Sequence, residues 1–226
     1  MLDEDIYTTY QNELSELVKK ISDPLNGLNT DGVIFVTKYL DSYKMVYYNN
    51  DGTYGKMCGN GIRCFIDYLY KNKKIPNKGT VYSDINCIDY EIDDSIKTTH
   101  KKAEFLGIYK YGRNNVYLTN SGVLHATMFV DKIDVKSLKR LYDKLESKYN
   151  TSFVHKNENG EYEILTYEVG AGLTKACGTA AISWASILNL PEIKVHYQLG
   201  TIIVKTDESV HLKGFTTSVC FGEYQY

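Results

Sequence analysis

The sequence predicts an α+β fold of two similar halves, each a mixed sheet or barrel around a central helix. The 226 residues are enough for two cores of about 110 residues each. Strand-like segments outnumber helical ones along the chain. A glycine-containing loop that leads through a cysteine into a helix occurs twice, within residues 48–64 and 167–183.

The first half is expected to begin with a helix over residues 3–21, because its apolar residues recur at helical spacing. Strands should follow over 32–38 and 42–50, and the segment NNDGTYGK should form a loop. A second helix should start near Cys58 and end by residues 74–76. Its apolar residues share one face at i, i+3, i+4 and i+7: Ile62, Phe65, Ile66 and Leu69.

Alternating segments then predict a series of strands, at 79–84, 87–92, 103–111, 115–120 and 125–131. A helix over 135–149 and a strand over 161–169 should come next. The second glycine-containing loop leads into a helix over 176–190, which ends before Pro191. Three further strands are expected, at 193–199, 201–207 and 210–215.

The two loops form an internal repeat. YNNDGTYGKMCGNGIRC, from Tyr48, aligns without a gap with YEVGAGLTKACGTAAIS, from Tyr167, at an offset of 119 residues. The identical pairs are Tyr48 and Tyr167, Lys56 and Lys175, Cys58 and Cys177, and Gly59 and Gly178. We therefore divide the chain into an N-terminal half, 1–109, that carries Cys58 and a C-terminal half, 110–226, that carries Cys177.

Composition narrows the classes of function. A formal net charge of −2 disfavours nucleic acid as a partner, despite 21 tyrosines, which suit half-buried strand positions. No apolar run is long enough to cross a bilayer, and the acidic N-terminus is unlike a secretory signal, so no membrane contact and a cytoplasmic location are expected. The five cysteines and five histidines are scattered, which predicts reduced thiols and no metal site. Pairing of two copies through a strand edge, giving a homodimer, stays open.

Cys58 and Cys177 are the candidate catalytic residues. A cysteine at a strand-to-helix turn places its sulfur at a helix N-terminus, where the helix dipole favours thiolate and free N–H groups can hold a carboxylate. Two facing sites of this kind could bind an amino acid's α-carboxylate, with one sulfur on each side of its α-carbon. One thiolate and one thiol would then invert that carbon by removing a proton from one face and supplying one to the other. The remaining cysteines, Cys64, Cys87 and Cys220, are expected to be small buried residues.

These motifs resemble a known family. MCGNGIRC at 57–64 and ACGTAA at 176–181 are similar to the two cysteine motifs of diaminopimelate epimerase, and the resemblance extends from NGLNTDGVIFV at 26–36 to the C-terminal strands. Proline racemases share the fold, but their first motif usually has His in place of Asn60, which makes them the weaker match. The resemblance implies a pseudo-symmetric two-domain fold, an active site at the interface of the two halves, an amino-acid substrate, and no pyridoxal phosphate, metal or other cofactor.

The resemblance also implies substrate-binding residues. Asn49 and Asn150 match family asparagines that bind substrate. Residues at both helix starts match those whose N–H groups hold the α-carboxylate: Gly59, Asn60, Gly178 and Thr179. His125 matches the His of the family's GNPH motif, and Glu168 matches the Glu of its ERG motif.

Two positions depart from the family pattern at the distal end of the substrate. Val169 replaces the Arg of ERG, and Val123 replaces the Asn of GNPH. Loss of the guanidinium removes a charge-assisted pair with a distal carboxylate. We therefore expect a related amino acid without a second zwitterionic end; histidine, lysine and other standard amino acids are all compatible.

Two other hypotheses about the function stay open. A non-catalytic or redox-regulated homologue could form a reversible Cys58–Cys177 disulfide. An isomerase of the same fold that uses a carboxylate would need neither cysteine.

Overall fold

The computed structural model describes residues 1–174, 176–197 and 200–223, and the chain divides into two compact units. Unit 1 is Met1–Ile96 with Phe215–Tyr226, and unit 2 is Lys97–Gly214. The expected boundary at 109/110 differs from this division in two ways. The first unit ends earlier, and the chain returns to it after the last strand, where Lys71 donates to the hydroxyl of Ser218 at 3.2 Å.

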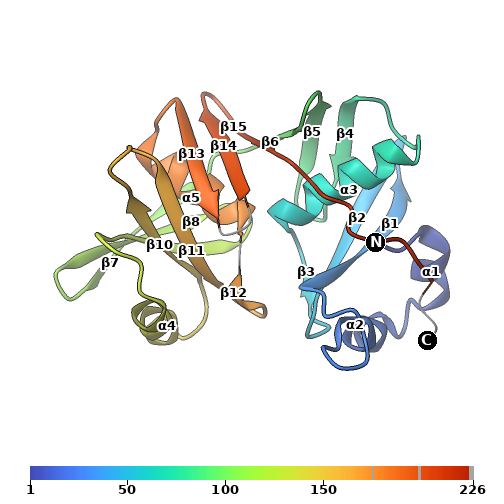
Figure 1. The fold of residues 1–226 in the computed structure, drawn as a ribbon, viewed down its shortest axis with the longest axis horizontal. Coiled ribbons are helices and arrows are strands. Elements are labelled where there is room, and N and C mark those ends of the chain that lie inside the picture. Colours follow the sequence, from blue (N-terminus) through green and yellow to red (C-terminus); the bar gives the residue numbers. More distant parts are fainter. Residues whose placement is uncertain (175, 198–199, 224–226) are drawn as a thin grey trace. The chain divides into compact units, whose positions relative to one another are not determined.

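Unit 1 is a small mixed sheet with helices on both faces (Figure 1). The sheet order is β1-β2-β4-β5, and β3 pairs with β2. Strands β2 and β4 run parallel, whereas the pairs β1–β2, β2–β3 and β4–β5 are antiparallel. The elements in chain order are α1 (Glu4–Thr9), α2 (Leu14–Ser22), β1 (Gly32–Tyr39), β2 (Ser42–Asn49), β3 (Tyr54–Gly55), α3 (Gly59–Lys71), β4 (Lys78–Tyr82) and β5 (Cys87–Ile92).

Strand β1 shows why this unit has two apolar layers. Successive side chains of a strand point to opposite faces of its sheet. Val33 and Phe35 pack in the cluster that contains α2, whereas Ile34 and Val36 pack in the cluster that contains α3. The near-continuous apolar run of β1 is therefore buried on both sides.

Unit 2 has a longer sheet, in the order β6-β15-β14-β13-β11-β10-β9-β8-β7, and β12 pairs with β11. Parallel pairs join β9 to β10 and β11 to β13. The strands are β6 (Ile96–His100), β7 (Glu104–Tyr111), β8 (Asn114–Asn120), β9 (Leu124–Phe129), β10 (Asn150–Lys156), β11 (Tyr162–Glu168), β12 (Gly172–Thr174), β13 (Glu192–Tyr197), β14 (Gly200–Thr206) and β15 (Val210–Gly214). The helices are α4 (Val135–Lys144) and α5 (Gly178–Leu188).

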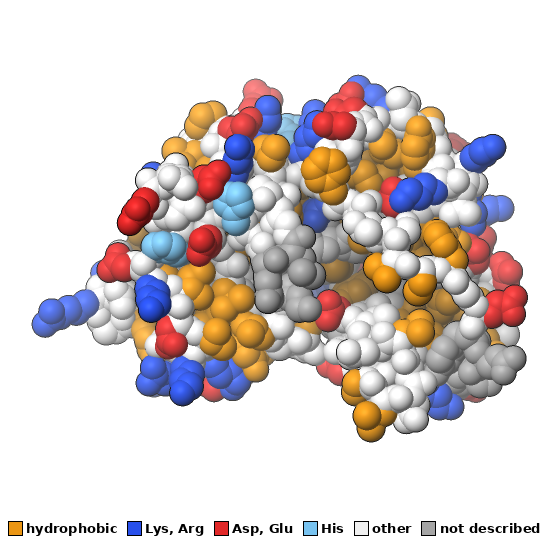
Figure 2. Space-filling model, viewed as in Figure 1, with side chains coloured by type: hydrophobic (Ala, Val, Ile, Leu, Met, Phe, Trp, Pro, Cys, Tyr) orange, Lys and Arg blue, Asp and Glu red, His pale blue; other side chains and the backbone are white. Residues whose placement is uncertain are grey.

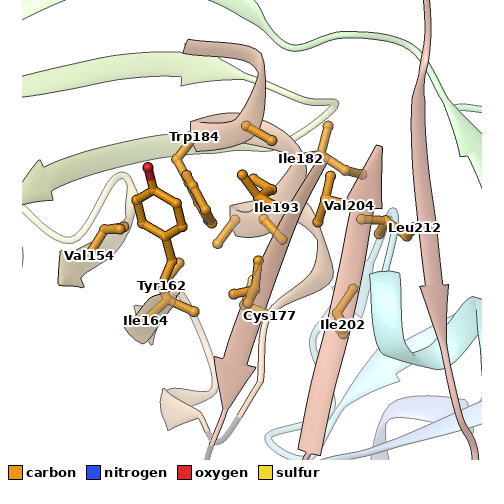
Figure 3. Close-up of a cluster of buried hydrophobic side chains, with 14 of the residues drawn as sticks. Val154, Tyr162, Ile164, Cys177, Ile182, Trp184, Ile193, Ile202, Val204 and Leu212 are labelled. Carbon is orange, nitrogen blue, oxygen red and sulfur yellow. The ribbon is translucent and has the colours of Figure 1, made fainter. Parts of the chain in front are cut away.

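The sheet of unit 2 also lies between two apolar layers. One cluster joins α4 to one face through Leu138, Leu141 and Phe153. The other joins α5 to the opposite face; it contains Trp184 and Tyr162, whose ring centroids are 4.9 Å apart. Figure 3 shows Cys177 within this second cluster.

The internal repeat corresponds to a repeated order of elements. α2-β1-β2-β3-α3 in unit 1 has the same order as α4-β10-β11-β12-α5 in unit 2, and Gly59 and Gly178 begin the last helix of each set. In both sets the two helices cover opposite faces of the sheet. The prediction of an α+β fold with two pseudo-symmetric halves is confirmed.

Three local predictions were wrong. Cys87 and Cys220, which were expected to be buried, are both exposed. The helix expected over 3–21 is divided by a turn at residues 10–13, after the β-branched Thr8 and Thr9, which are poor helix formers. Strand β6 was not expected. Its inward-facing residues, Ile96, Thr98 and His100, are buried, but two of the three are polar and conceal the alternation.

The surface carries both signs of charge. On the face in Figure 2, basic and acidic side chains are interspersed. Within the described ranges, no helix is both long enough and apolar enough to span a membrane.

Candidate active site

Cys58 caps the first turn of α3. Its backbone is extended, with φ −137° and ψ 112°, and its Sγ accepts a hydrogen bond from the Gly61 N–H at 3.2 Å. A Cβ on Gly61 would lie 3.1 Å from the Cys58 Sγ and 3.1 Å from the Ile34 Cδ1. The glycine therefore lets the helix approach the sulfur closely enough for an N–H to bind it.

The first turn of α3 is held by a side chain that sequence reasoning missed. Arg63 is 5% exposed; its guanidinium donates to the Gly59 carbonyl at 3.1 Å and to the Asn60 Oδ1 at 2.7 Å. These bonds fix the Asn60 amide and place a positive charge in the turn that begins at Cys58. The signal in the sequence was an arginine on the otherwise apolar side of the predicted helix.

Asn49 ends β2 at the loop before β3. Its Nδ2 donates to the Thr53 Oγ1 at 2.9 Å, and the Thr53 hydroxyl in turn donates to Asp51. The side chain is half-buried and held within the loop. Its role in binding stays a prediction.

Cys177 occupies the equivalent position at the start of α5 and is 3% exposed. Its Sγ lies 3.4 Å from the Thr179 Oγ1. Burial, and then the nearby Glu168 carboxylate, raise the pKa of the Cys177 thiol well above its usual value. Cys177 is therefore protonated in the resting protein, which the helix dipole alone would not have predicted.

Two further hydroxyls position the groups around Cys177. The Tyr197 hydroxyl donates to the Cys177 carbonyl at 2.6 Å, and the Thr174 hydroxyl donates to Glu168. Sequence reasoning identified neither. Both come from strands next to the helix start, and a lone Tyr or Thr in a strand carries no signal of such a contact.

Three predicted residues lie on neighbouring strands. His125 of β9 pairs in register with Asn150 of β10, and Glu168 follows the Thr151–Tyr167 pair at the same end of β11. The Asn150 Oδ1 accepts the backbone N–H of Val169 at 2.8 Å, which anchors the turn after Glu168. His125 is fully buried, and desolvation lowers its pKa from 6.5 to about 3, so its imidazole is neutral.

The candidate residues are thus distributed over both units. Unit 1 carries Cys58, Gly59, Asn60 and Asn49, whereas unit 2 carries Cys177, Gly178, Thr179, Glu168, Asn150 and His125. Of the two substituted positions, Val123 is half-buried and Val169 is 45% exposed. Lys175, the repeat partner of Lys56, lies outside the described residues. Among residues 1–174, 176–197 and 200–223, no group of three or more His, Cys, Asp or Glu side chains could hold a metal ion.

The chain is similar in sequence to known proteins. The family model for diaminopimelate epimerase matches residues 3–98. A diaminopimelate epimerase of Bacillus mycoides (strain KBAB4) is 28% identical over 257 aligned residues, covering 96% of this chain and 89% of the relative.

Solved structures support the fold. A probable proline racemase from Agrobacterium radiobacter K84 has a TM-score of 0.71 at 12% identity, covering 92% of this chain and 81% of that one. A PhzF-family phenazine biosynthesis protein from Bacillus anthracis has a TM-score of 0.69 at 12% identity, covering 91% and 86%. Cysteines at the N-caps of helices in both units, together with sequence similarity along nearly the whole chain, make this protein similar to the diaminopimelate epimerases.

Proposed function

We propose that the protein is a cofactor-independent amino-acid racemase or epimerase in which Cys58 and Cys177 act on opposite faces of the α-carbon. The observation that carries the proposal is the repeated cysteine cap. Each unit places a cysteine at the N-cap of the helix that ends the same series of elements. A reaction that needs two acid–base groups on opposite faces of one carbon matches two equivalent sites in two similar units.

We propose the starting roles of the two sulfurs from their environments. Cys177 is a thiol, because burial and Glu168 raise its pKa. Two-base inversion needs one thiolate, and that role falls to Cys58, whose Sγ accepts the Gly61 N–H. The Cys58 thiolate removes the α-proton and becomes a thiol. The electron pair of the C–H bond stays on the substrate as a carbanion, which then takes the Cys177 proton on the other face and leaves a thiolate there.

The two helix starts are suited to the substrate's α-carboxylate. Free N–H groups of a helix's first turn bind anions, and the helix dipole adds to the attraction. The candidate donors are the backbone groups of Gly59, Asn60, Gly178 and Thr179. Fixed dipoles of this kind would also stabilise the negative charge that develops when the α-proton leaves.

The distal end of the substrate is proposed to be uncharged or singly charged. Val169 stands where the family has arginine, and its backbone N–H is held by the Asn150 Oδ1. An apolar side chain here cannot pair with a second α-carboxylate. Histidine and lysine are the first candidates to test.

A survey of α-proton exchange in D₂O tests the proposal. Purified protein is incubated with each standard amino acid and with LL-diaminopimelate, and both deuterium uptake and inversion are measured. We expect inversion of at least one standard amino acid, and its loss by about 10²-fold or more in Cys58→Ala and in Cys177→Ala. Cys87→Ala, at an exposed strand position, is the matched control and should keep the wild-type rate.

The same survey separates the alternatives. Turnover of LL-diaminopimelate alone would show that Val123 and Val169 do not change specificity. Undiminished turnover in both cysteine variants, with loss in Glu168→Gln, would favour an isomerase that uses a carboxylate. No turnover of any amino acid, with a Cys58–Cys177 disulfide in the purified protein, would favour the redox-regulated homologue.

A further inference from the structure

The imidazole of His125 is buried without a hydrogen-bond partner among the described residues. Its side chain is 0% exposed, and neither Nδ1 nor Nε2 has a hydrogen-bond partner among the described residues. A neutral imidazole has one donor and one acceptor, and both require partners inside a protein. The ring lies on the face of β9 that also presents Phe129, which packs against the cluster containing α5.

Two buried threonines on the same face also have hydroxyls without a partner among the described residues. Thr119 of β8 is the cross-strand partner of His125, and Thr127 follows His125 by two residues along β9. Side chains in both relations lie on one face of a sheet. Their exposures are 1% and 0%, and neither hydroxyl has a partner among the described residues.

Helix α5 contributes a third hydroxyl. The Thr179 carbonyl accepts the Ser121 hydroxyl at 3.4 Å, and the Ser186 hydroxyl accepts the Ala103 N–H at 3.0 Å. These contacts direct one side of α5 toward the β8–β9 turn and the start of β7. Ser183 follows Thr179 by four residues and is on that same side. It is 0% exposed, and its Oγ also has no partner in the described part of the chain.

These four side chains place five buried polar atoms in the layer where α5 packs against strands β8 and β9. Burying one polar atom without a hydrogen bond is costly, and five in one layer are not expected in a stable core. A site with several polar partners is where internal water binds. Hydroxyls can donate or accept, so water here could satisfy both nitrogens of the ring.

We propose that His125, Thr119, Thr127 and Ser183 form an internal water-binding site, and that the bound water holds the His125 ring in one neutral tautomer. His125 is then a positioning residue under the helix that Cys177 caps. The water site follows from packing and hydrogen bonding alone; only its consequence for catalysis rests on the proposed function.

A high-resolution crystal structure of the wild-type protein is the first test. We expect at least one ordered water that bridges a His125 nitrogen and one of the three hydroxyls. Direct hydrogen bonds between the ring and the hydroxyls, with no ordered water among them, would overturn the proposal. This result does not depend on activity, so an inactive protein with the water in place would refute the proposed function and leave the water site standing.

Solution NMR is the second test. The ¹⁵N shifts of His125 should show a single neutral tautomer in the wild type, and Thr127→Val and Ser183→Ala should each shift the ring toward a mixture. Thr166→Val is the matched control, because Thr166 is a buried threonine of the same sheet whose hydroxyl already pairs with Ser152 at 2.9 Å. A tautomer that is unchanged in both test variants would contradict the proposal.

Discussion

The hydroxyl of Tyr197 donates a 2.6 Å hydrogen bond to the backbone carbonyl of Cys177, the N-cap of α5. The same carbonyl accepts the Ala181 N–H at 3.2 Å. The contact ties the end of β13 to the first turn of the helix. It therefore fixes the backbone that carries the proposed catalytic sulfur.

Tyr197→Phe should separate positioning from folding. Loss of one hydrogen bond should lower the free energy of unfolding by about 1 kcal/mol, measured by denaturant titration. Turnover should fall about tenfold, with a smaller change in KM, because the sulfur is displaced while the carboxylate donors remain. Tyr54→Phe, on an exposed strand residue, should change neither quantity. Unchanged kcat in Tyr197→Phe would remove the positioning role.

Gly61→Ala should impair activity without unfolding the protein. The new Cβ would lie 3.1 Å from the Cys58 Sγ, so the sulfur must shift by a few tenths of an ångström. Alanine favours a helix over glycine by about 1 kcal/mol, which offsets part of the crowding. We expect kcat to fall by about tenfold or more while the thermal midpoint changes little. Gly222→Ala, with no neighbouring atom within 4 Å, is the control; equal activity of the two variants would contradict the assigned contact.

His125 should make the protein less stable in acid. Its pKa is about 3 in the folded protein and 6.5 when unfolded, so below pH 6.5 the unfolded state binds a proton that the folded state does not. The free energy of unfolding should therefore be about 2 kcal/mol lower at pH 5 than at pH 7 from this residue alone.

The non-titrating variant His125→Gln isolates this contribution. Denaturant titrations at pH 7 and pH 5 should show a smaller loss of stability in the variant than in the wild type. The same loss in both proteins would mean that His125 is protonated in the folded state.

Val169→Arg should change specificity toward substrates with a distal carboxylate. Val169 is 45% exposed and its backbone N–H is already bound by Asn150, so a longer side chain can be accommodated without a backbone change. A guanidinium here should raise kcat/KM for LL-diaminopimelate by about tenfold or more relative to the wild type. Val169→Lys adds a positive charge without the planar guanidinium and should raise kcat/KM for LL-diaminopimelate by less. No gain with either variant would place the specificity elsewhere.

The fold could be predicted largely from the repeat. Cys58 and Cys177 are 119 residues apart in matching contexts, and both proved to be N-caps of helices that cover a sheet. Strand β6 could not be predicted, because Thr98 and His100 face inward and do not alternate in polarity with their neighbours. No sequence pattern predicts that the last segment returns to unit 1, because a contact such as that of Lys71 with Ser218 depends on tertiary structure alone.

The sequence predicted which residues belong to the candidate site, but not the surroundings of each side chain. The motifs identified Cys177 and Glu168, but burial, and then the nearby Glu168 carboxylate, raise the pKa of the Cys177 thiol, which the helix dipole alone would have lowered. Arg63 was missed because an arginine in a predicted helix is usually a surface residue. Its buried role becomes clear only from its hydrogen bonds to Gly59 and Asn60.

Isotope distribution at low conversion tests the two-base claim most directly. A single enantiomer of a substrate found in the exchange survey is incubated in D₂O, and substrate and product are separated after a few per cent conversion. Two bases on opposite faces predict deuterium at the α-carbon of the product and almost none in the recovered substrate, because the proton arrives from a different sulfur than the one that removed it. Equal deuterium in both enantiomers from the start would mean that one base serves both faces, and would contradict the paired roles of Cys58 and Cys177.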